Sequence, residues 1–224
     1  MPNFLINYSP NFSTQARNNK SIKFIVLHYT GMISENKAIN RLTDVNSKVS
    51  CHYFIKNNGE IIRMVPEKYI AWHAGKSKWK KLNSLNKYSI GIEIQNQGHN
   101  FKYSKFKDKQ ISSTIKLCKY LKQKYKIKKN FILGHSDISY ERKKDPGEKF
   151  PWKKLSKLKL SYWHGLDENK NKKLRSIKLN DVEEKIFFKN VQKIGYNISL
   201  NSKKNKIKLF IKAFQRRFRQ SLIN

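Results

Sequence analysis

The stretch Ile22-Lys-Phe-Ile-Val-Leu-His28 predicts a β-strand in the middle of a sheet. It is nearly continuous in β-branched, aromatic and other apolar residues, as strands buried on both faces are. A second strand is predicted over Ser89-Ile-Gly-Ile-Glu-Ile-Gln95, where isoleucine occupies every other position and therefore points to one face. Glu93 points to the opposite face of that strand.

The segments around these strands complete an α/β pattern. The β-type runs 51–56 and 60–65 are separated by Asn57-Asn-Gly59, which is typical of a hairpin. The other predicted elements are a helix with Ser34 as N-cap, a helix over 108–125, a short strand over 130–134 and a closing helix over 152–160. This order predicts an α/β domain over residues 1–160, with a mixed central β-sheet flanked by helices.

The composition changes after residue 160. Residues 161–176 are predicted to be a linker, because Asp167–Lys173 is polar and charged. Helical patterns over 181–193 and 206–222 then predict a small all-α module over 177–224. With about 45 residues, this module is near the size at which independent folding becomes doubtful. We therefore expect it to pack against the first domain.

The net charge is the strongest feature of the composition. Lys and Arg total 49 against 15 Asp and Glu, which gives a net charge of +34 and a pI of about 10.2. Such an excess attracts polyanions. The positive residues are mostly Lys, however, and they are spread along the chain without a zinc-finger, RNP or recognition-helix signature. We therefore predict no specific nucleic-acid partner.

The two cysteines, Cys51 and Cys118, are too few for a disulfide framework. Cys118 falls on the apolar side of a predicted helix, where a buried free thiol is the ordinary interpretation. Cys51 stands beside His52, and this pair raises the alternatives of a metal ligand or a nucleophile. A better set of metal ligands lies elsewhere in the chain.

That better set consists of His28, His135 and Asp145. Each histidine ends a predicted strand, and Asp145 stands in the turn Asp145-Pro-Gly147. The ends of strands are where α/β sheets present reactive groups. Two imidazoles and a carboxylate form a three-ligand zinc set that leaves a fourth position for water, as catalytic sites do. The sequence spacing is wide, so a structural role for each histidine remains the alternative.

Glu93 is a further candidate. A carboxylate among three isoleucines is costly in free energy unless it faces a polar site. The alternative is a solvent-facing residue on an edge strand.

Six motifs in order carry a family resemblance. They are Val26-Leu-His-Tyr-Thr-Gly31, Ser50-Cys-His-Tyr-Phe-Ile55, Ala71-Trp-His-Ala-Gly75, Ser89-Ile-Gly-Ile-Glu-Ile94, Gly134-His-Ser-Asp-Ile138 and Lys143-Lys-Asp-Pro-Gly147. Together, over about residues 9 to 160, the chain closely resembles the zinc-dependent N-acetylmuramoyl-L-alanine amidases, which share their fold with peptidoglycan recognition proteins. The resemblance implies hydrolysis of the amide between N-acetylmuramic acid, or its anhydro form, and L-alanine of the stem peptide, in peptidoglycan or muropeptides.

The resemblance also implies roles for individual residues. His28, His135 and Asp145 would bind Zn²⁺, Glu93 would be the general base, Lys143 would stabilise the oxyanion, and Trp72 and His73 would line the substrate groove. A packing role is the alternative for Trp72 and His73. The presence of Asp145 favours an enzyme over a non-catalytic peptidoglycan-binding or polyanion-binding protein of the same fold.

Two neighbouring polar residues are left with alternatives. His52, on a hairpin strand, is more consistent with a structural role. Asp137 either orients a metal ligand or caps a turn.

The C-terminal module has a weaker resemblance. Val191-Gln-Lys-Ile-Gly-Tyr196 and Ala213-Phe-Gln-Arg-Arg-Phe-Arg219 are similar to the helical peptidoglycan-binding module that follows some of these amidases, although that module is usually longer. Alternatively, the phenylalanines at i, i+4 and i+8, which are Phe210, Phe214 and Phe218, only dock onto the first domain. A basic amphipathic helix on an anionic membrane is a third interpretation.

The compartment is predicted from the same features. No stretch approaches the roughly 20 apolar residues that cross a bilayer, so no transmembrane segment is predicted. The first 20 residues lack a basic segment followed by an apolar one, which favours the cytoplasm. A wall-binding tail would favour the periplasm as the alternative. We expect a monomer.

Overall fold

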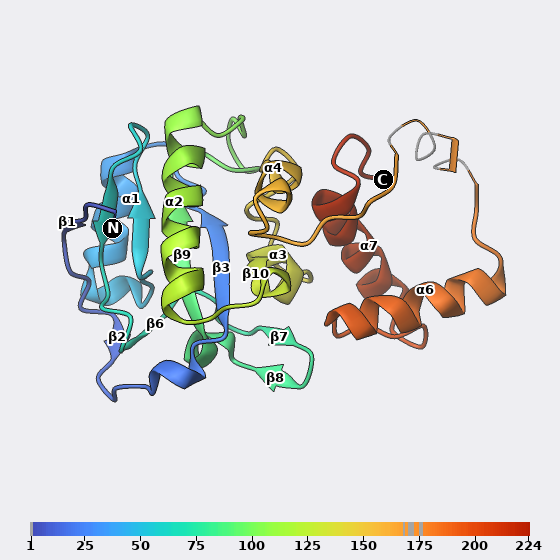
Figure 1. The fold of residues 1–224 in the computed structure, drawn as a ribbon, viewed down its shortest axis with the longest axis horizontal. Helices are drawn as coiled ribbons and strands as arrows, with labels where there is room; N and C mark the ends of the chain where they lie inside the picture. Colours follow the sequence, from blue (N-terminus) through green and yellow to red (C-terminus); the bar gives the residue numbers. More distant parts are fainter. Residues whose placement is uncertain (1, 168, 170–172, 175–176) are drawn as a thin grey trace.

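Strand β3 (Phe24–Tyr29) lies inside a six-stranded mixed sheet, as predicted, between β9 (Ser89–Ile94) and β10 (Ile132–Gly134) (Figure 1). The order is β1-β5-β4-β9-β3-β10, in which only β4 and β5 are antiparallel. The other strands are β1 (Leu5–Ile6), β4 (Tyr53–Ile55) and β5 (Ile61–Arg63). The β4–β5 pair is the predicted hairpin. The structure is a computed structural model and describes residues 2–167, 169, 173–174 and 177–224.

Two short strand pairs lie outside this sheet. They are β2 (Phe12–Ser13) with β6 (Ile70–Ala71), and β7 (Lys78–Trp79) with β8 (Leu82–Asn83).

Apart from a four-residue helix that begins at His135 and was not predicted, the helices agree with the predicted ones to within a few residues. They are α1 (Glu35–Thr43), α2 (Asp108–Lys124), α3 (His135–Ile138), α4 (Trp152–Lys157), α6 (Asp181–Ile194) and α7 (Lys204–Phe218). Ser34 is the N-cap of α1, and its hydroxyl accepts a hydrogen bond from the Lys37 backbone amide. Helix α7 ends at Phe218, four residues before the predicted end at 222.

Alternation along β3 divides the core between the two faces of the sheet. Ile25 and Leu27 pack with β9 isoleucines and with α2 on one face. Phe24 and Val26 point to the other face, where they join a cluster that includes residues of α6 and α7. By the same period of two, His28 lies on that second face.

The C-terminal helices complete this second face. Phe188 of α6 and Phe210 of α7 are buried in the same cluster as Phe24 and Val26, and Phe214 and Phe218 pack against it. Figure 1 shows α6 and α7 beyond α3 and β10, at the end of the sheet opposite β1. The expectation that the tail packs against the first domain is confirmed. The predicted linker, 161–176, falls partly outside the described residues.

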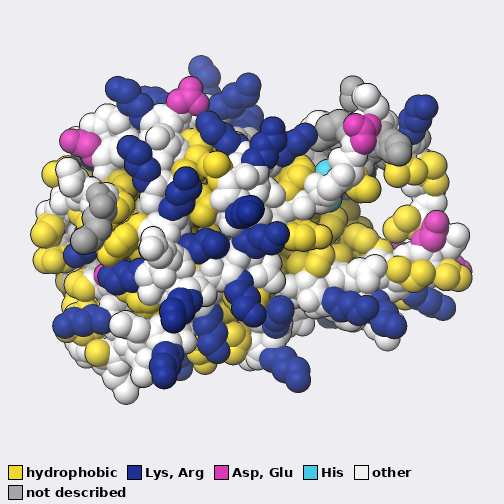
Figure 2. Space-filling view, in the orientation of Figure 1, with side chains coloured by type: hydrophobic (Ala, Val, Ile, Leu, Met, Phe, Trp, Pro, Cys, Tyr) yellow, Lys and Arg dark blue, Asp and Glu magenta, His cyan; other side chains and the backbone are white. Residues whose placement is uncertain are grey.

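On the face shown in Figure 2, the positive charge is spread rather than concentrated. Figure 2 shows lysine and arginine side chains scattered over the face that bears α2 and α4. Among the described residues, no helix has the length and apolar character needed to cross a membrane.

Both cysteines are free and buried. Burial raises the pKa of the Cys51 thiol well above its ordinary value, and the carboxyl group of Glu93 adds to this effect. A thiol that stays protonated is a poor nucleophile and a poor metal ligand, so these two alternatives for Cys51 are not supported.

Candidate active site

Strand register brings the candidate site residues together. His28 in β3 is the direct neighbour of Glu93 in β9. On the other side of β3, Gly134 of β10 pairs with Leu27, so that His135 follows directly beside His28. The Ser136 backbone amide donates a hydrogen bond of 2.9 Å to the Asp145 carbonyl oxygen, which fixes the Asp145 loop against α3. All these strands are parallel, and the site lies at their carboxyl ends, as expected for such sheets.

The three predicted metal ligands converge on one point. His28 Nδ1 lies 2.9 Å from His135 Nδ1, and each of these nitrogens lies 3.0 Å from Asp145 Oδ2. All three residues are buried. Among the described residues, they form the one group of His, Cys, Asp and Glu side chains with a geometry suited to a metal ion.

A chain of hydrogen bonds settles which nitrogen of His28 carries the proton. The Leu85 carbonyl can only accept, so the Ser89 hydroxyl donates to it over 2.7 Å. The Ser89 oxygen then accepts from His73 Nε2, at 3.1 Å. This leaves His73 Nδ1 to accept from His28 Nε2, at 3.0 Å. In neutral His28, the nitrogen that faces Asp145 is therefore an unprotonated acceptor.

His135 is oriented in the same way. Its Nε2 lies 3.1 Å from the Ala74 carbonyl oxygen, which can only accept, so in neutral His135 the Nε2 donates and Nδ1 presents a lone pair. Arg142 donates to the same carbonyl. Burial, followed by the nearby His135, lowers the pKa of His28 to about 4, so His28 is neutral near pH 7.

These protonation states fit a bound cation. Two imidazole lone pairs and a carboxylate oxygen face one another with no hydrogen to share, an arrangement that a metal ion would satisfy. The separations of 2.9 and 3.0 Å allow one zinc ion at its usual distance of about 2.0–2.2 Å from each atom. Hydrogen bonds from the outer nitrogens to a carbonyl and to another side chain are typical of metal-binding histidines.

The His73 ring packs directly against the backbone of Gly91. A Cβ atom at residue 91 would lie 2.3 Å from His73 Cγ, so only glycine leaves room for the ring. His73 lines the cavity, as predicted. Both of its nitrogens are engaged, however, with His28 and Ser89, so neither is left for a hydrogen bond to a substrate.

Glu93 faces the metal ligands from the neighbouring strand. Its Oε1 lies 4.0 Å from His28 Nδ1, its Oε2 is buried without a hydrogen-bond partner, and its side chain is only 16% exposed. Burial, with the negative charge of Asp145, raises the pKa of Glu93 well above its ordinary value. The alternative of a solvent-facing residue on an edge strand is wrong, because β9 lies between β3 and β4.

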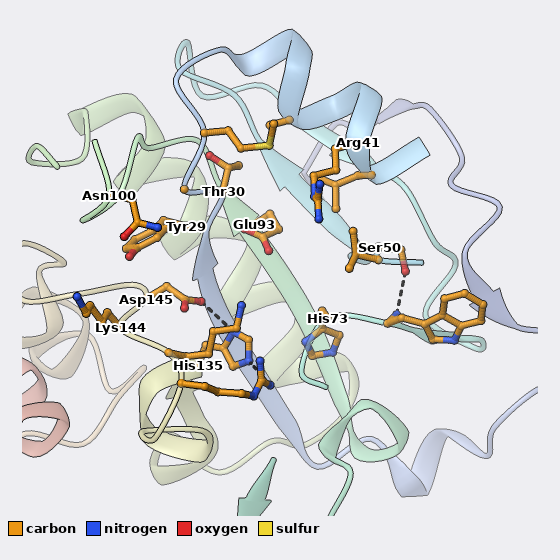
Figure 3. A pocket seen from close by; sticks show the side chains of 18 residues that line it. Tyr29, Thr30, Arg41, Ser50, His73, Glu93, Asn100, His135, Lys144 and Asp145 are labelled. Atoms are coloured by element: carbon orange, nitrogen blue, oxygen red, sulfur yellow. Dashed lines mark hydrogen bonds and ion pairs between the residues drawn. The ribbon is translucent and has the colours of Figure 1, made fainter. Parts of the chain in front are cut away.

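A cavity of about 370 Å³ opens in front of these groups. Its lining includes the predicted residues Trp72, His73, Glu93, His135, Lys143 and Asp145, and residues that the sequence did not single out, among them Tyr29, Arg41, Asn100 and Arg142. In Figure 3, Glu93 and Asp145 point into one space, with Arg41 of α1 on the opposite wall. Arg142 directly precedes the Lys143-Lys-Asp-Pro-Gly147 motif, which was the available signal for it.

The two lysines before Asp145 differ in their surroundings. Lys143 is half-buried, and its charge lowers the pKa of both Glu93 and His28. Lys144 also lines the cavity but is exposed, and Figure 3 shows it on the outer side of Asp145, away from Glu93.

The remaining two candidates have structural contacts. The Gly91 amide donates to His52 Nδ1, so His52 Nε2 donates to the Tyr69 carbonyl oxygen, 3.2 Å away. The Asp137 carboxylate accepts from the Gly134 amide at 2.7 Å, which is the capping interpretation.

The chain is similar to proteins of known activity. Residues 18–148 match the sequence model of the N-acetylmuramoyl-L-alanine amidase family Amidase_2. The N-acetylmuramoyl-L-alanine amidase AmiD of Escherichia coli is 33% identical over 215 residues, which are 91% of this chain and 77% of AmiD. The 1,6-anhydro-N-acetylmuramyl-L-alanine amidase AmpD of Haemophilus influenzae is 32% identical over 170 residues, which are 67% of this chain and 90% of AmpD.

Solved structures with bound muropeptides have the same fold. AmpDh3 of Pseudomonas aeruginosa, in complex with an anhydromuramic pentapeptide, superposes with a TM-score of 0.79 at 27% identity and covers 96% of this chain and 89% of its own. AmiD of E. coli, in complex with anhydro-N-acetylmuramic acid-L-Ala-D-γ-Glu-L-Lys, gives a TM-score of 0.78 at 32% identity. The superposition covers 95% of this chain and 85% of the AmiD chain. With the matched family description, these likenesses establish that the chain belongs to the N-acetylmuramoyl-L-alanine amidase family Amidase_2.

Proposed function

We propose that this chain hydrolyses the amide bond between N-acetylmuramic acid, or its anhydro form, and L-alanine of the stem peptide. The observation that carries this proposal is the convergence of His28, His135 and Asp145 at 2.9–3.0 Å, with Glu93 4.0 Å from His28. The relatives named for this reaction support it. A complete ligand set favours catalysis over binding alone.

We further propose that the bound metal is Zn²⁺, held by His28, His135 and Asp145. Two imidazole nitrogens and one carboxylate oxygen are a donor set that zinc uses in hydrolases. When bound, zinc lowers the pKa of water and polarises a carbonyl oxygen.

Two side chains then have separate roles: one transfers the proton, and the other stabilises the negative charge of the transition state. Glu93 accepts a proton from the water that attacks the lactyl carbonyl carbon. The Lys143 ammonium faces the negative charge that develops on the carbonyl oxygen. When the C–N bond breaks, Glu93 returns the proton to the amino group of L-alanine. The products are a free lactyl carboxylate and a stem peptide with a free amino terminus.

Mass spectrometry on a disaccharide-tetrapeptide muropeptide tests the reaction. We expect a free tetrapeptide and a disaccharide with a carboxylic acid, together with close to one zinc ion per chain. Asp145→Ala should hold much less zinc in the same buffer, because it removes one of three ligands. Intact substrate after incubation of zinc-loaded protein with this muropeptide and with its anhydro form would overturn the proposed function.

Ser89→Ala should weaken zinc binding from a distance. The substitution removes the acceptor for His73 Nε2 and so frees His73 from the orientation in which it accepts from His28. Changes to such outer partners typically cost about 10–100-fold in metal affinity, and we expect about tenfold here. The Kd for zinc is measured by competition with a chromophoric chelator.

Ser77→Ala is the matched control for Ser89→Ala. Ser77 is also buried, and its hydroxyl accepts a hydrogen bond of 3.0 Å from the Leu85 amide. The hydrogen bonds of the Ser77 hydroxyl involve Gly75 and Leu85 and leave His73 untouched. Equal zinc affinities in the two variants would contradict a role for Ser89 in orienting His28.

A further inference from the structure

A side chain of α7 reaches the strand that leads to a metal ligand. Arg217 is only 4% exposed. Its Nη2 donates to the carbonyl oxygen of Ile132 in β10, at 3.3 Å, and its guanidinium carbon lies 3.3 Å from the centroid of the Trp152 ring. Strand β10 ends one residue before His135.

Asp137 connects the C-terminal helices to His135 itself. Its Oδ2 accepts from the Gly134 amide, at 2.7 Å, and so caps the short helix that starts at His135. The same oxygen forms an ion pair with Arg217 at 3.4 Å. Its Oδ1 accepts from the hydroxyl of Tyr196, at 2.6 Å, in the connection between α6 and α7. The Asp137 carboxylate therefore links the start of α3 to the C-terminal module, because Oδ2 binds both the Gly134 amide and Arg217 while Oδ1 binds Tyr196.

A second set of contacts reaches the loop that carries Asp145. Gln220 Nε2 donates to the Phe150 carbonyl oxygen over 2.7 Å. Arg216 Nε lies 3.8 Å from Glu148 Oε2, three residues after Asp145. Two of the three metal ligands thus stand on segments that the end of the chain holds.

We propose that the C-terminal helices are a structural part of the metal centre, in which Tyr196 and Arg217 position His135, and Gln220 positions the Asp145 loop. This proposal rests on the proposed zinc amidase function. These three side chains act through Asp137 and the backbone and are positioning residues. A wall-binding role for the module stays a prediction, but it would be additional to this one.

The polar contacts between α3 and the C-terminal helices support a role in positioning His135 rather than a role only in docking the helices. The phenylalanines of α6 and α7 already provide apolar docking. A buried ion pair is a weak source of stability, because desolvation of both charges opposes their attraction. Asp137 and Arg217 are 2% and 4% exposed, respectively. Directional hydrogen bonds at this place fix the geometry of the Gly134–His135 segment, which apolar contacts do not do.

The test compares two tyrosines of the same interface in the full-length protein. Tyr196→Phe removes the hydroxyl that donates to Asp137 and keeps the ring in the core. The control is Tyr140→Phe, which removes a hydrogen bond of 2.7 Å from Tyr140 to the Asn197 carbonyl oxygen. Zinc affinity is measured by chelator competition, the thermal midpoint on metal-free protein, and the ligand field by the visible spectrum of the Co²⁺ form.

We expect Tyr196→Phe to weaken zinc binding about tenfold and to change the Co²⁺ spectrum, as loss of an outer partner does. Tyr140→Phe should stay within about twofold of wild type, although both variants lower the thermal midpoint of metal-free protein. Gln220→Ala, on a half-buried side chain, tests the Asp145 loop separately and should weaken zinc binding even where Tyr196→Phe does not fold.

Two outcomes would overturn the proposal: zinc affinities that fall equally in Tyr196→Phe and Tyr140→Phe, or wild-type affinity in both Tyr196→Phe and Gln220→Ala. Absence of zinc binding in the wild-type protein would instead contradict the proposed function itself. The two failures are therefore distinguishable.

Discussion

Exchange of Glu93 for glutamine is expected to lower kcat on a muropeptide by about 10²–10⁴-fold while one zinc ion stays bound. Glutamine keeps the size and the hydrogen-bonding shape of glutamate, but its amide does not accept a proton at neutral pH. Glu93 is poised for that task, since its Oε1 lies 4.0 Å from His28 Nδ1 and its Oε2 has no partner. Its pKa is raised by burial, and a bound cation would bring it down again.

Glu67→Gln is the matched control for this experiment. Glu67 is also a largely buried carboxylate of the same domain, but it contacts Tyr53 and Lys124 and does not line the cavity. Its exchange should leave kcat close to wild type, even where it lowers the thermal midpoint. Wild-type kcat in zinc-loaded Glu93→Gln would remove Glu93 from the mechanism.

Glu93 also illustrates what the sequence reveals about the fold. Alternation with three isoleucines was sufficient to place it on the face away from them, because side chains on a strand have a strict period of two. Whether that face met solvent or a site depended on which strands lay beside β9. Strand pairing is a long-range property, and local periodicity does not encode it. The family resemblance supplied the role that the pattern left open.

His73 shows a second limit. The motif Ala71-Trp-His-Ala-Gly75 indicated a residue of the groove, and the ring does line the cavity. Its hydrogen bonds to His28 and Ser89 join positions 45 and 16 residues away, respectively. No local pattern marks such contacts, so the sequence offered groove or core as alternatives and missed the orienting contact.

The C-terminal module shows a third limit. The spacing of its phenylalanines correctly indicated a docking face, since apolar residues at i, i+4 and i+8 share one side of a helix. Arg217 lies in the motif Ala213–Arg219, but nothing in the sequence distinguishes it from the other positive residues of a chain with 49 of them. Its burial against Asp137, 80 positions earlier, follows only from the folded structure. The composition therefore shows an excess of positive charge but does not reveal which arginine forms a specific buried ion pair.

The second large effect is expected on kcat when Lys143 is replaced, and its neighbour Lys144 provides the comparison because the two lysines differ in position. Lys143→Ala should lower kcat about 10²–10³-fold with zinc retained, which corresponds to about 3–4 kcal/mol of transition-state stabilisation. The reason is electrostatic: Lys143 lines the same cavity as Glu93, and its positive charge, which lowers the pKa of Glu93 and His28, would stabilise the oxygen that becomes negative there. Lys143→Arg should restore part of the loss, because the charge returns with a different shape.

Lys144→Ala is the control, and its kcat should stay within about threefold of wild type, as is usual for an exposed charge in high dielectric. Its side chain is exposed and lies on the outer side of Asp145 in Figure 3. Removal of either lysine lowers the net charge by one unit, so a general attraction of the basic surface for an acidic muropeptide would change both variants alike and mainly in KM. A kcat loss confined to Lys143→Ala therefore separates local oxyanion stabilisation from long-range attraction. Equal losses in kcat in both variants would show that the role assigned to Lys143 is wrong.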